Sequence, residues 1–502
     1  MVLKTGNDYI DSLKGRRLDA YFLGEKVTDP AGHPVIGSSI RALAATYDLA
    51  HDSDPARRAL ATAETPEGAV VSRFTHIHRS ADDLVKKIKL QRTLGRRVGC
   101  CFQRCVGWDA LNALFITTHE VDAALGTSYH QRFLRFLAHV QESDLVCQGA
   151  MTDVKGDRGA RPRRQEDPDL FVHVVRRTAD HIVVRGAKAH QTGALGSHEI
   201  IVMPTLALGP GEEDYAVSFA VPSDTPGITF VVGRQASDLR AIYDLPLDQG
   251  NARFAAHEAL TVFDDVTVPL ERVFLLGEVA YSGKLVERFA GFHRQSYGGC
   301  KAGIGDVLIG AVALAADYNG VAGASHVRDK LVEMVHLNET IYSCGLACSS
   351  EGKATPAGSY IIDLLLANVC KQNVTRIPFE MARLAQDLAG GLMSTLPSAK
   401  DLANPATGEY LRKYLKGVPG VATEDRMRVL RLIETLTIGR GAVSYLAESM
   451  HGAGSPQAQR VVIGRQAPLD EYKEAAKALA GIDASSFRGA GGDMAPPHGL
   501  GA

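Results

Sequence analysis

Cys101 and Cys105 frame the short sequence Cys-Phe-Gln-Arg-Cys. If this segment is helical, the four-residue spacing places both thiols on one face, where they could bind a single metal ion or cluster. A second pair, Cys344 and Cys348, has the same spacing within an apolar segment. Buried cysteines also pack as small hydrophobic residues. Spacing alone therefore does not distinguish a metal-binding pair from a pair in the core.

A second candidate region is the segment 287–301, with the sequence ERFAGFHRQSYGGCK. His293 and Cys300 are two helical turns apart, so they share a face if the helix persists. Gly298 and Gly299 are expected to weaken that helix, as happens where a backbone approaches a cofactor. The crowding of polar and reactive side chains is typical of a site, but a polar helix end with a hydrogen-bonded histidine explains it equally well.

Together, Cys101, Cys105, Cys300 and His293 would supply three thiolates and one imidazole. Such a set suits a structural zinc ion or an iron–sulfur cluster. An iron bound by imidazole in place of thiolate would be held more weakly and would be open to a substrate oxygen. Cys₃His is also a familiar closed zinc set, so the residue types leave both metals possible.

Two polar segments, 151–159 and 186–193, lie in a region expected to be rich in β-strands. Their glycine, threonine, aspartate and basic residues could present N–H groups and a cation to a flavin and its pyrophosphate, although ordinary turns have the same composition. No GxGxxG motif follows a predicted strand, which argues against a Rossmann-type site. The candidate flavin-binding residues are Met151, Thr152, Lys155, Asp157, Arg158, His190, Gln191, Thr192, Gly390 and Gly391.

Two glutamates could act as acid or base. Glu258 precedes a predicted strand and Glu448 lies in the sequence LAESMHGAG. A carboxyl group in apolar surroundings can have a raised pKa and exchange protons near neutral pH. Surface glutamates are far commoner, so the sequence alone only nominates these two.

The elements that must position these residues follow the order helical, β, helical, an α+β multidomain class. Residues 1–150 read as mostly helical, with Ser80 capping one helix. Residues 151–275 contain short β-branched and aromatic runs between turn residues, which predicts a small sandwich or barrel. Over 276–484 helical periodicity returns as in a bundle, and Gly390–Gly391 marks a bend or a close backbone approach. The Gly/Pro-rich tail, 485–502, is expected to be disordered.

Specific elements are expected from the periodicity. Besides the helix that Ser80 caps, the predicted helices are 108–125, 129–140, 278–296, 301–318, 325–350, 358–393, 424–451 and 469–481. The predicted strands are 170–175, 181–184, 200–203, 216–221, 228–232 and 260–263.

Composition excludes several classes of protein. The 502 residues are 45% hydrophobic and 22% charged, with a formal net charge of −2, so no strong field favours nucleic acid or an anionic membrane. The longest apolar run, 307–316, is far shorter than the ~18 residues of a membrane span. With no apolar signal-peptide stretch, we expect a cytoplasmic protein whose eight cysteines form no disulfide framework.

Eight longer strings carry a resemblance that covers nearly the whole chain, from about Tyr9 to Ile482. They resemble the 4-hydroxybutyryl-CoA dehydratase family, whose members also isomerise vinylacetyl-CoA. The strings are CFQRCVG (101–107), GAMTDVKGDRG (149–159), VRGAKAHQTGA (184–194), ERFAGFHRQSYGGCK (287–301), ALAADYNG (313–320), LLLANVCKQNVTR (364–376), DLAGGLM (387–393) and ESMHGAGSPQAQR (448–460).

The resemblance implies an acyl-CoA dehydrogenase-like fold, with a flavin between the β-domain and the C-terminal bundle. It also implies a homotetramer with one FAD and one [4Fe–4S] cluster per subunit. By motif, the cluster ligands are Cys101, Cys105, His293 and Cys300, and Cys344 and Cys348 become core thiols. The positions implied around substrate and flavin are Tyr297, Lys301, Glu258, Glu448, Gln103 and Thr192.

The implied reaction is dehydration of 4-hydroxybutyryl-CoA to crotonyl-CoA, with isomerisation of vinylacetyl-CoA to the same product. A base removes the C2 proton, and one-electron oxidation by the flavin makes the C3 proton removable. A cluster iron acts as Lewis acid on the C4 hydroxyl. We expect His293 to serve as ligand and base, Glu448 to assist it, and Tyr297 to protonate the departing hydroxyl.

Two other functions remain possible from the sequence. One is a flavin-dependent monooxygenase of the 4-hydroxyphenylacetate 3-hydroxylase type, which has no use for a Cys/His quartet. The other is a non-catalytic acyl-CoA-binding scaffold whose cysteines hold structural zinc.

Overall fold

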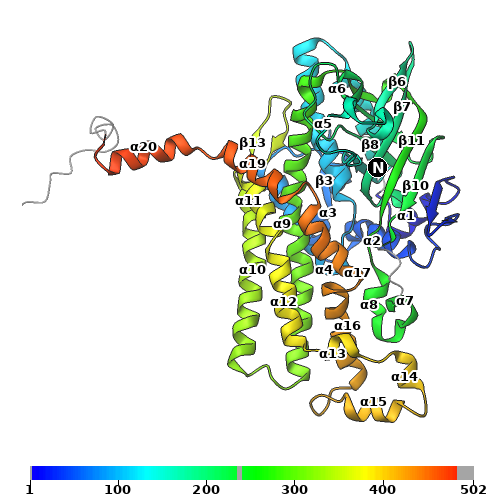
Figure 1. Cartoon of the computed structure of the whole chain (residues 1–502), viewed down its shortest axis with the longest axis vertical. Coiled ribbons are helices and arrows are strands. Elements are labelled where there is room, and N and C mark those ends of the chain that lie inside the picture. Colours follow the sequence, from blue (N-terminus) through cyan, green and yellow to red (C-terminus); the bar gives the residue numbers. More distant parts are fainter. Residues whose placement is uncertain (1–2, 235–239, 483–502) are drawn as a thin grey trace, which may run out of the picture.

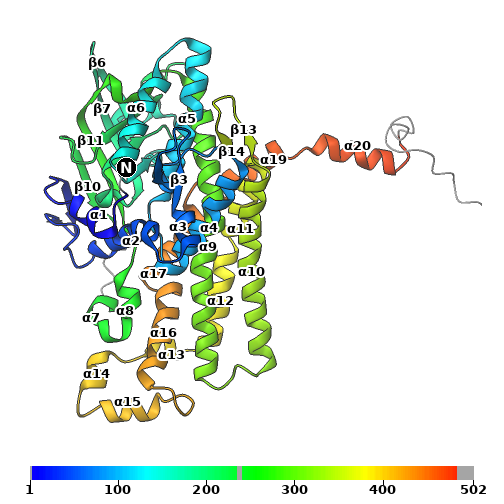
Figure 2. The same ribbon diagram turned by 180° about the vertical axis from the view of Figure 1, so that it is seen from behind.

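The computed structural model describes residues 3–234 and 240–482. A two-layered β region lies beside a set of long helices, and the N-terminal helices fill the space between them (Figure 1). The opposite view shows the same arrangement, with the last helix, α20 (Leu469–Leu479), projecting from the body (Figure 2). No residue of α20 is buried. The predicted tail, 485–502, lies outside the described residues, and the predicted domain boundaries stay a prediction.

The N-terminal region is mainly helical, as predicted. Ser80 accepts a hydrogen bond from the backbone N–H of Asp83 and so caps α4, which confirms the predicted cap. The region also contains strands that the sequence analysis missed, because they are only two to four residues long. The elements are α1 (Gly6–Ser12), β1 (Asp19–Phe22), β2 (Glu25–Lys26), α2 (Gly37–Asp48), α3 (Pro55–Ala61), β3 (Thr62–Glu64), β4 (Val70–Ser72), α4 (Ala81–Val98), α5 (Cys105–Leu125) and α6 (Tyr129–Glu142).

The β region is a sandwich of two sheets. The six-stranded sheet has the order β2, β1, β10 (Ile228–Val232), β11 (Glu258–Pro269), β7 (His181–Thr192) and β6 (His173–Arg177). The four-stranded sheet has the order β12 (Val273–Leu276), β9 (Val217–Pro222), β8 (Glu199–Val202) and β5 (Cys147–Ala150). Alternate residues of both sheets form one buried core, which includes Phe230 and Phe263 from the first and Ile200 and Phe219 from the second.

Two strands are longer than predicted, and this changes where candidate residues lie. β7 continues through Thr192 and pairs with β11, with Thr192 opposite Glu258. The segment 186–192 is therefore a strand end, and the expectation of a loop after a short strand was wrong. Its glycine and polar residues do not break the strand because β11 and the bridge at Asp153 satisfy its backbone. Two short helices, α7 (Arg240–Tyr243) and α8 (Leu245–Arg253), also interrupt the β region.

The longest helix, α9 (Val279–Tyr318), runs without a break for 40 residues. The prediction that Gly298 and Gly299 weaken it was wrong. A Cβ on Gly298 would lie 2.6 Å from the Gly345 Cα, and one on Gly299 would lie 2.5 Å from the Ile88 carbonyl oxygen. These glycines therefore let the backbones of α10 (Ser325–Ser350) and α4 pack closely against α9.

The remaining bundle helices are shorter than predicted. The region 358–393 divides into three helices, with Gly390 (φ +69°) ending the second, so the predicted bend is confirmed. The region 424–451 divides after Thr437, where Ile438 and Gly439 leave the helical conformation, and its second part contains a π-helical turn, 443–447. The elements are β13 (Lys353–Ala354), β14 (Tyr360–Ile361), α11 (Leu364–Val374), α12 (Ile377–Ala389), α13 (Leu392–Thr395), α14 (Ala399–Ala403), α15 (Gly408–Tyr414), α16 (Thr423–Thr437), α17 (Arg440–Ala442), α18 (Glu448–His451) and α19 (Pro456–Gln466).

Helix α9 is long and apolar enough to cross a membrane by length and composition. However, 61% of its most apolar window is buried inside the fold, where α4, α5, α10 and α11 pack around it. A helix that is apolar on most sides and covered in this way is a core helix.

Candidate functional site

Cys101 and Cys105 lie where α4 passes into α5. Cys101 belongs to the non-helical connection, and Cys105 is the first residue of α5. The expectation that both share one helical face was therefore wrong for Cys101. Between them, Gln103 adopts a left-handed backbone (φ +62°) and exchanges two hydrogen bonds with Ser39 of α2. This buried amide fixes the course of the connection.

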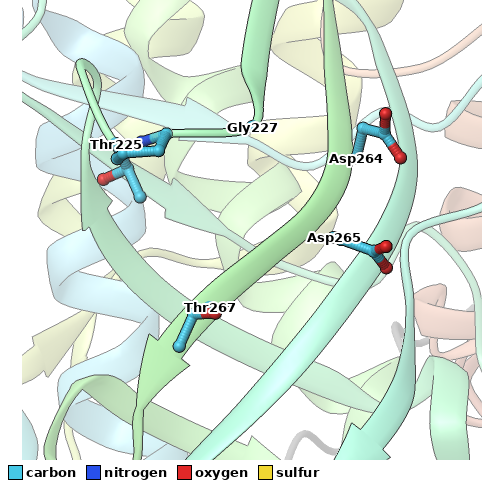
Figure 3. Close-up of a pocket in the computed structure, with 6 residues that line it drawn as sticks. Thr225, Gly227, Asp264, Asp265 and Thr267 are labelled. Carbon is cyan, nitrogen blue, oxygen red and sulfur yellow. The ribbon is translucent and has the colours of Figure 1, made fainter.

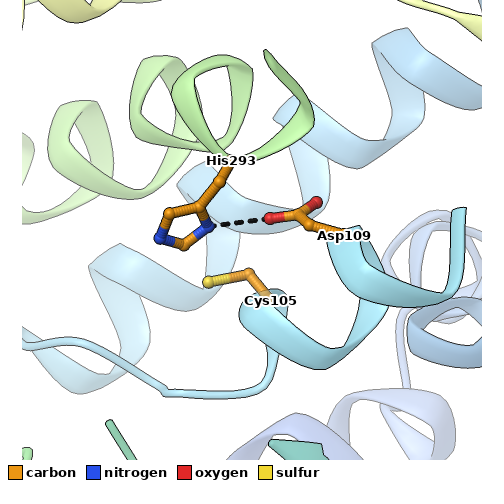
Figure 4. Close-up of side chains that lie close together, drawn as sticks. All are labelled: Cys105, Asp109 and His293. Atoms are coloured by element: carbon orange, nitrogen blue, oxygen red, sulfur yellow. Dashed lines mark hydrogen bonds and ion pairs between the residues drawn. The ribbon is translucent and has the colours of Figure 1, made fainter. Parts of the chain in front are cut away.

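His293 of α9 meets Cys105 and Asp109 of α5. One donor atom from each lies within 4.8 Å of the others, and no other set of three Cys, His, Asp or Glu groups in the described parts of the chain is as close. The Nδ1 atom of His293 is 2.8 Å from Asp109 Oδ2, and the Cys105 sulfur lies beside the imidazole (Figure 4). The sequence analysis missed Asp109, although its four-residue spacing from Cys105 places the two on one face of α5.

The three predicted cysteine ligands share one electrostatic environment. Burial raises the pKa of the Cys101, Cys105 and Cys300 thiols, and the Glu448 charge raises all three further. For Cys105, the Asp109 charge is the largest cause after burial. For Cys300, burial raises the pKa to about 11 although Lys301 opposes it. A positively charged metal centre is what would hold such thiols as thiolates.

Tyr297 lies on the next turn of α9, edge-on to the His293 ring at 5.3 Å between centroids. The ammonium groups of Lys371 and Lys301 lie 4.4 and 5.0 Å from the centroid of its ring. A Cβ on Gly452 would collide with the phenol oxygen, so this glycine leaves room for the hydroxyl. Burial, followed by the charges of Glu448 and Cys300, raises the pKa of Tyr297 well above its ordinary value and favours the protonated phenol.

Glu448 and Glu258 come from opposite sides of the site. Lys301 Nζ is 2.9 Å from Glu448 Oε2, and Oε1 of this carboxylate is buried and has no hydrogen-bond partner among the described residues. Burial and the nearby Glu448 charge raise the pKa of Glu258 to about 7, despite a 3.2 Å hydrogen bond from Thr192. The structure thus places Tyr297, Lys301, Glu448 and Glu258 in one environment.

A short segment, 444–454, is attached to α9 and α11 by three cations that donate to its backbone carbonyls. Lys301 donates to the Ser444 carbonyl, Lys371 to that of Ser449, and Arg294 to that of Ala453 at 3.0 Å. Glu448 follows directly after the π-helical turn, a feature frequent at functional sites.

The sequence analysis did not single out Lys371, which stands in the quoted motif LLLANVCKQNVTR. Burial, together with the charges of Lys301 and Arg294, lowers the pKa of Lys371 to about 7. A basic residue in a strongly apolar helix was the signal that could have identified it.

Most candidate flavin residues gather where the connection after β5 runs beside β7. Asp153 pairs with Lys188 there, at 2.6 Å, and the Thr152 carbonyl accepts from the Ala189 N–H. Met151 and Gln191 are buried, whereas Lys155, Asp157, Arg158 and His190 are exposed. The exposed members form an open polar edge on the sandwich.

His190 has a left-handed backbone (φ +57°), which is costly for a non-glycine residue and concentrates at functional sites. Burial, followed by the positive charges of Lys155 and His451, lowers its pKa. The end of β7 therefore lies near α18, the helix that begins with Glu448.

Within one chain, Gly390 and Gly391 do not lie near the other candidate flavin residues. Both are exposed, and added Cβ atoms would meet nothing within 4 Å. They lie between α12 and α13, at the end of the bundle remote from β7 in both views (Figures 1 and 2).

A separate surface pocket of about 350 Å³ lies where the turn between β9 and β10 meets the middle of β11. Its lining includes Thr225, Gly227, Asp264, Asp265 and Thr267, but none of the candidate site residues (Figure 3). The geometry therefore gives no reason to place the chemistry in this pocket.

All eight cysteines are free, as expected without a disulfide framework. Cys348 is fully buried in α10, and Cys344 is partly buried and accepts a hydrogen bond from Asn373 Nδ2 at 3.4 Å. Neither cysteine belongs to the group formed by Cys105, Asp109 and His293.

Two family models match the chain. The model described as 4-hydroxyphenylacetate 3-hydroxylase N terminal matches residues 5–275, and the model of the C-terminal part matches residues 282–481. Together they span almost all of the described residues.

The chain is 53% identical to the 4-hydroxybutyryl-CoA dehydratase/vinylacetyl-CoA-Delta-isomerase of Clostridium aminobutyricum, over 96% of this chain and all of that one. A solved 4-hydroxybutyryl-CoA dehydratase from N. maritimus superposes with a TM-score of 0.93 at 51% identity, covering 99% of this chain and 97% of that one. The FAD complex of a 4-hydroxyphenylacetate 3-monooxygenase oxygenase component gives a TM-score of 0.84 at 26% identity, over 96% and 100% of the two chains. The chain therefore belongs to the 4-hydroxyphenylacetate 3-hydroxylase family, and within it to the group of 4-hydroxybutyryl-CoA dehydratases.

Proposed function

We propose that this chain dehydrates 4-hydroxybutyryl-CoA to crotonyl-CoA and isomerises vinylacetyl-CoA to crotonyl-CoA. The observation that carries the proposal is the meeting of Cys105 and His293 within one turn of Tyr297, beside Lys301 and Glu448. The identity to a dehydratase of this activity, over the full length of that relative, supports the same reaction.

The donor set fits a [4Fe–4S] cluster better than a single zinc ion. Tetrahedral zinc, with bonds of ~2.0–2.3 Å, holds all its donor atoms within about 4 Å of one another. Among the described residues, Cys101 and Cys300 belong to no group of three donors within 4.8 Å. A [4Fe–4S] cluster takes one ligand on each of its irons, so its donor atoms can lie farther apart than those of a single zinc ion. Cys101, Cys105, Cys300 and His293 would hold it.

FAD would lie between the sandwich and the bundle. The side bordered by the sandwich offers Met151, Thr152, Lys155, Asp157, Arg158, His190, Gln191 and Thr192. FAD bound to a relative of the same fold supports this cofactor. In the proposed homotetramer, the exposed Gly390 and Gly391 would be available to the flavin of a neighbouring subunit.

Different residues of the chain would carry out the separate proton transfers. When bound, FAD would supply one-electron oxidation and the cluster a Lewis-acid iron. His293 offers Nε2 as a base toward the substrate because Asp109 holds its Nδ1. Tyr297, kept protonated by burial and by the Glu448 charge, donates a proton to the departing hydroxyl. Glu448 assists the base.

Glu258, with its pKa raised to about 7, can exchange a proton near neutral pH. Lys301 holds Glu448 in place through their 2.9 Å ion pair. We assign both residues to the catalytic group, in a cytoplasmic enzyme with an acyl-CoA dehydrogenase-like arrangement of domains.

A flavin-dependent monooxygenase is the second candidate, because relatives such as the Thermus thermophilus oxygenase component are 28% identical over 95% of the chain. Anaerobic purification followed by iron, sulfide, zinc and flavin analysis separates the candidates. Iron with sulfide and FAD, together with turnover of both acyl-CoA substrates, is expected. FAD alone would indicate the monooxygenase, and zinc alone the scaffold.

A further inference from the structure

Three helices meet in a buried polar cluster directly behind His293. Lys87 comes from α4, Asp109 from α5, and His293 and Ser296 from α9. The side chains of Lys87 and Asp109 are 0% exposed, and Lys87 Nζ is 2.5 Å from Asp109 Oδ1. Asp109 binds His293, whereas Lys87 and Ser296 bind Asp109. None of the three was expected to take part in the site, and the proposed proton transfers use none of them directly.

The polar atoms of Lys87 and Asp109 form their hydrogen bonds inside the protein. Lys87 also donates to the Phe292 carbonyl at 3.0 Å, and its ammonium lies 5.3 and 5.4 Å from the ring centroids of Trp108 and Phe292. Asp109 uses one oxygen for Lys87 and the other for His293 and Ser296, at 2.8 and 3.2 Å. A buried ion pair is retained at a high desolvation cost, which points to a role beyond packing.

The arrangement determines which nitrogen of His293 can bind metal. An ionised carboxylate only accepts hydrogen bonds, so Nδ1 must carry the ring proton and Nε2 keeps its lone pair. The Nε2 atom makes no hydrogen bond within the described parts of the chain, and the Cys105 sulfur lies beside the same ring (Figure 4). A carboxylate behind the imidazole is the arrangement that orients ligating histidines and strengthens them as donors.

We propose that Asp109, held by Lys87, is a positioning residue that fixes the tautomer and ring orientation of His293 as a ligand of the inorganic centre. The same hydrogen bond would keep the ring in its place whether or not Nε2 is bound to iron. This inference rests on the proposed function, because it needs the cluster to be present.

The test compares Asp109→Asn with wild type in anaerobically purified holoenzyme. In this variant Lys87 attracts the amide oxygen, which turns the N–H₂ toward Nδ1 and moves the ring proton to Nε2. We expect iron loss to a ferrous chelator to accelerate about 10- to 100-fold. The Mössbauer signal of the nitrogen-bound iron should change, while FAD content stays as in wild type.

A matched control is Asp306→Asn. Asp306 also ties α9 to α4, through ion pairs with Arg92 and Arg96, but it does not contact the candidate ligands. Iron retention in this variant should equal that of wild type. Equal acceleration in both variants would overturn the inference, because it would show a general effect of losing a helix-to-helix ion pair.

A double-mutant cycle tests whether Asp109 acts through His293. In a His293→Cys background the imidazole is gone, so Asp109→Asn should no longer accelerate iron loss. An undiminished effect in that background would assign Asp109 a purely structural role. If Asp109→Asn alone does not fold, Lys87→Met/Asp109→Asn removes both charges together and enters the same cycle. Wild type without iron and sulfide would instead refute the proposed function.

Discussion

The helical side and the strand side of the candidate site are built differently. On the helical side, Lys87 and Asp109 are completely buried and each polar atom has a defined partner. On the strand side, Lys155 and Arg158 are exposed at an open edge. Preformed geometry suits an inorganic centre whose ligands must be placed accurately, whereas an open edge suits an organic cofactor that contributes its own contacts.

The largest effect should come from the helical side. Cys105→Ser removes a thiolate at the meeting point with His293, so we expect loss of cluster iron and of dehydration together. The measurement is iron and sulfide per chain, alongside turnover of 4-hydroxybutyryl-CoA.

Cys348→Ser is the matched control, since Cys348 has the same four-residue spacing to a second cysteine and is also fully buried. It should retain iron and activity. A comparable loss in both variants would mean that the Cys105 effect comes from the core and would contradict the assignment of ligands.

Tyr297→Phe should have the next largest effect, because it removes the acid but keeps the ring between the two lysines. We expect kcat to fall by about 10²- to 10⁴-fold with iron and FAD unchanged. Tyr445→Phe, a fully buried tyrosine of the bundle whose hydroxyl contacts Met381, serves as the control. Undiminished dehydration by Tyr297→Phe would exclude its role as acid.

The two glutamates give a pH-dependent prediction. The folded chain keeps a proton on Glu258 up to about pH 7, whereas the unfolded chain releases it near the ordinary value. The free energy of unfolding contributed by this group therefore falls as pH rises between those values. Glu258→Gln should remove this contribution to the pH dependence of the free energy of unfolding. The measurement is denaturant unfolding across pH 5–8.

Glu448→Gln sharpens this prediction. Because the Glu448 charge helps to raise the pKa of Glu258, its removal should move the titration of Glu258 to lower pH. An unchanged midpoint would show that the two carboxyl groups do not share one environment.

The smallest effect is expected on the strand side. Arg158→Ala removes one exposed cation, so the affinity for FAD should fall only about two- to fivefold. Arg164→Ala, an exposed arginine of the following turn, should leave it unchanged. A loss of FAD binding from Arg158→Ala as complete as the iron loss from Cys105→Ser would break the contrast between the two sides.

Local signals predicted much of the fold. Ser80 identified the start of α4, and short β-branched and aromatic runs located β8, β9 and β10 within one residue. Gly298 and Gly299 led to a wrong prediction because glycine weakens an isolated helix. In the folded chain they permit close contact of α9 with α10 and α4. That contact depends on residues distant in sequence.

The candidate site shows the same division. The four predicted ligands come from two motifs, and the resemblance to a known family identified them as ligands of one iron–sulfur cluster. Asp109 and Lys87 were missed because their role arises only where α4, α5 and α9 meet. Cys101 was misplaced on a helix because spacing does not show that α5 begins at Cys105.

The central claim is that one iron–sulfur centre joins the α4–α5 connection to α9. The most direct measurement is anomalous diffraction at the iron edge from anaerobically grown crystals of the holoenzyme. The account predicts iron density bounded by Cys101, Cys105, His293 and Cys300, beside the proposed position of FAD. Density at a single zinc ion, or iron located away from His293, would contradict it.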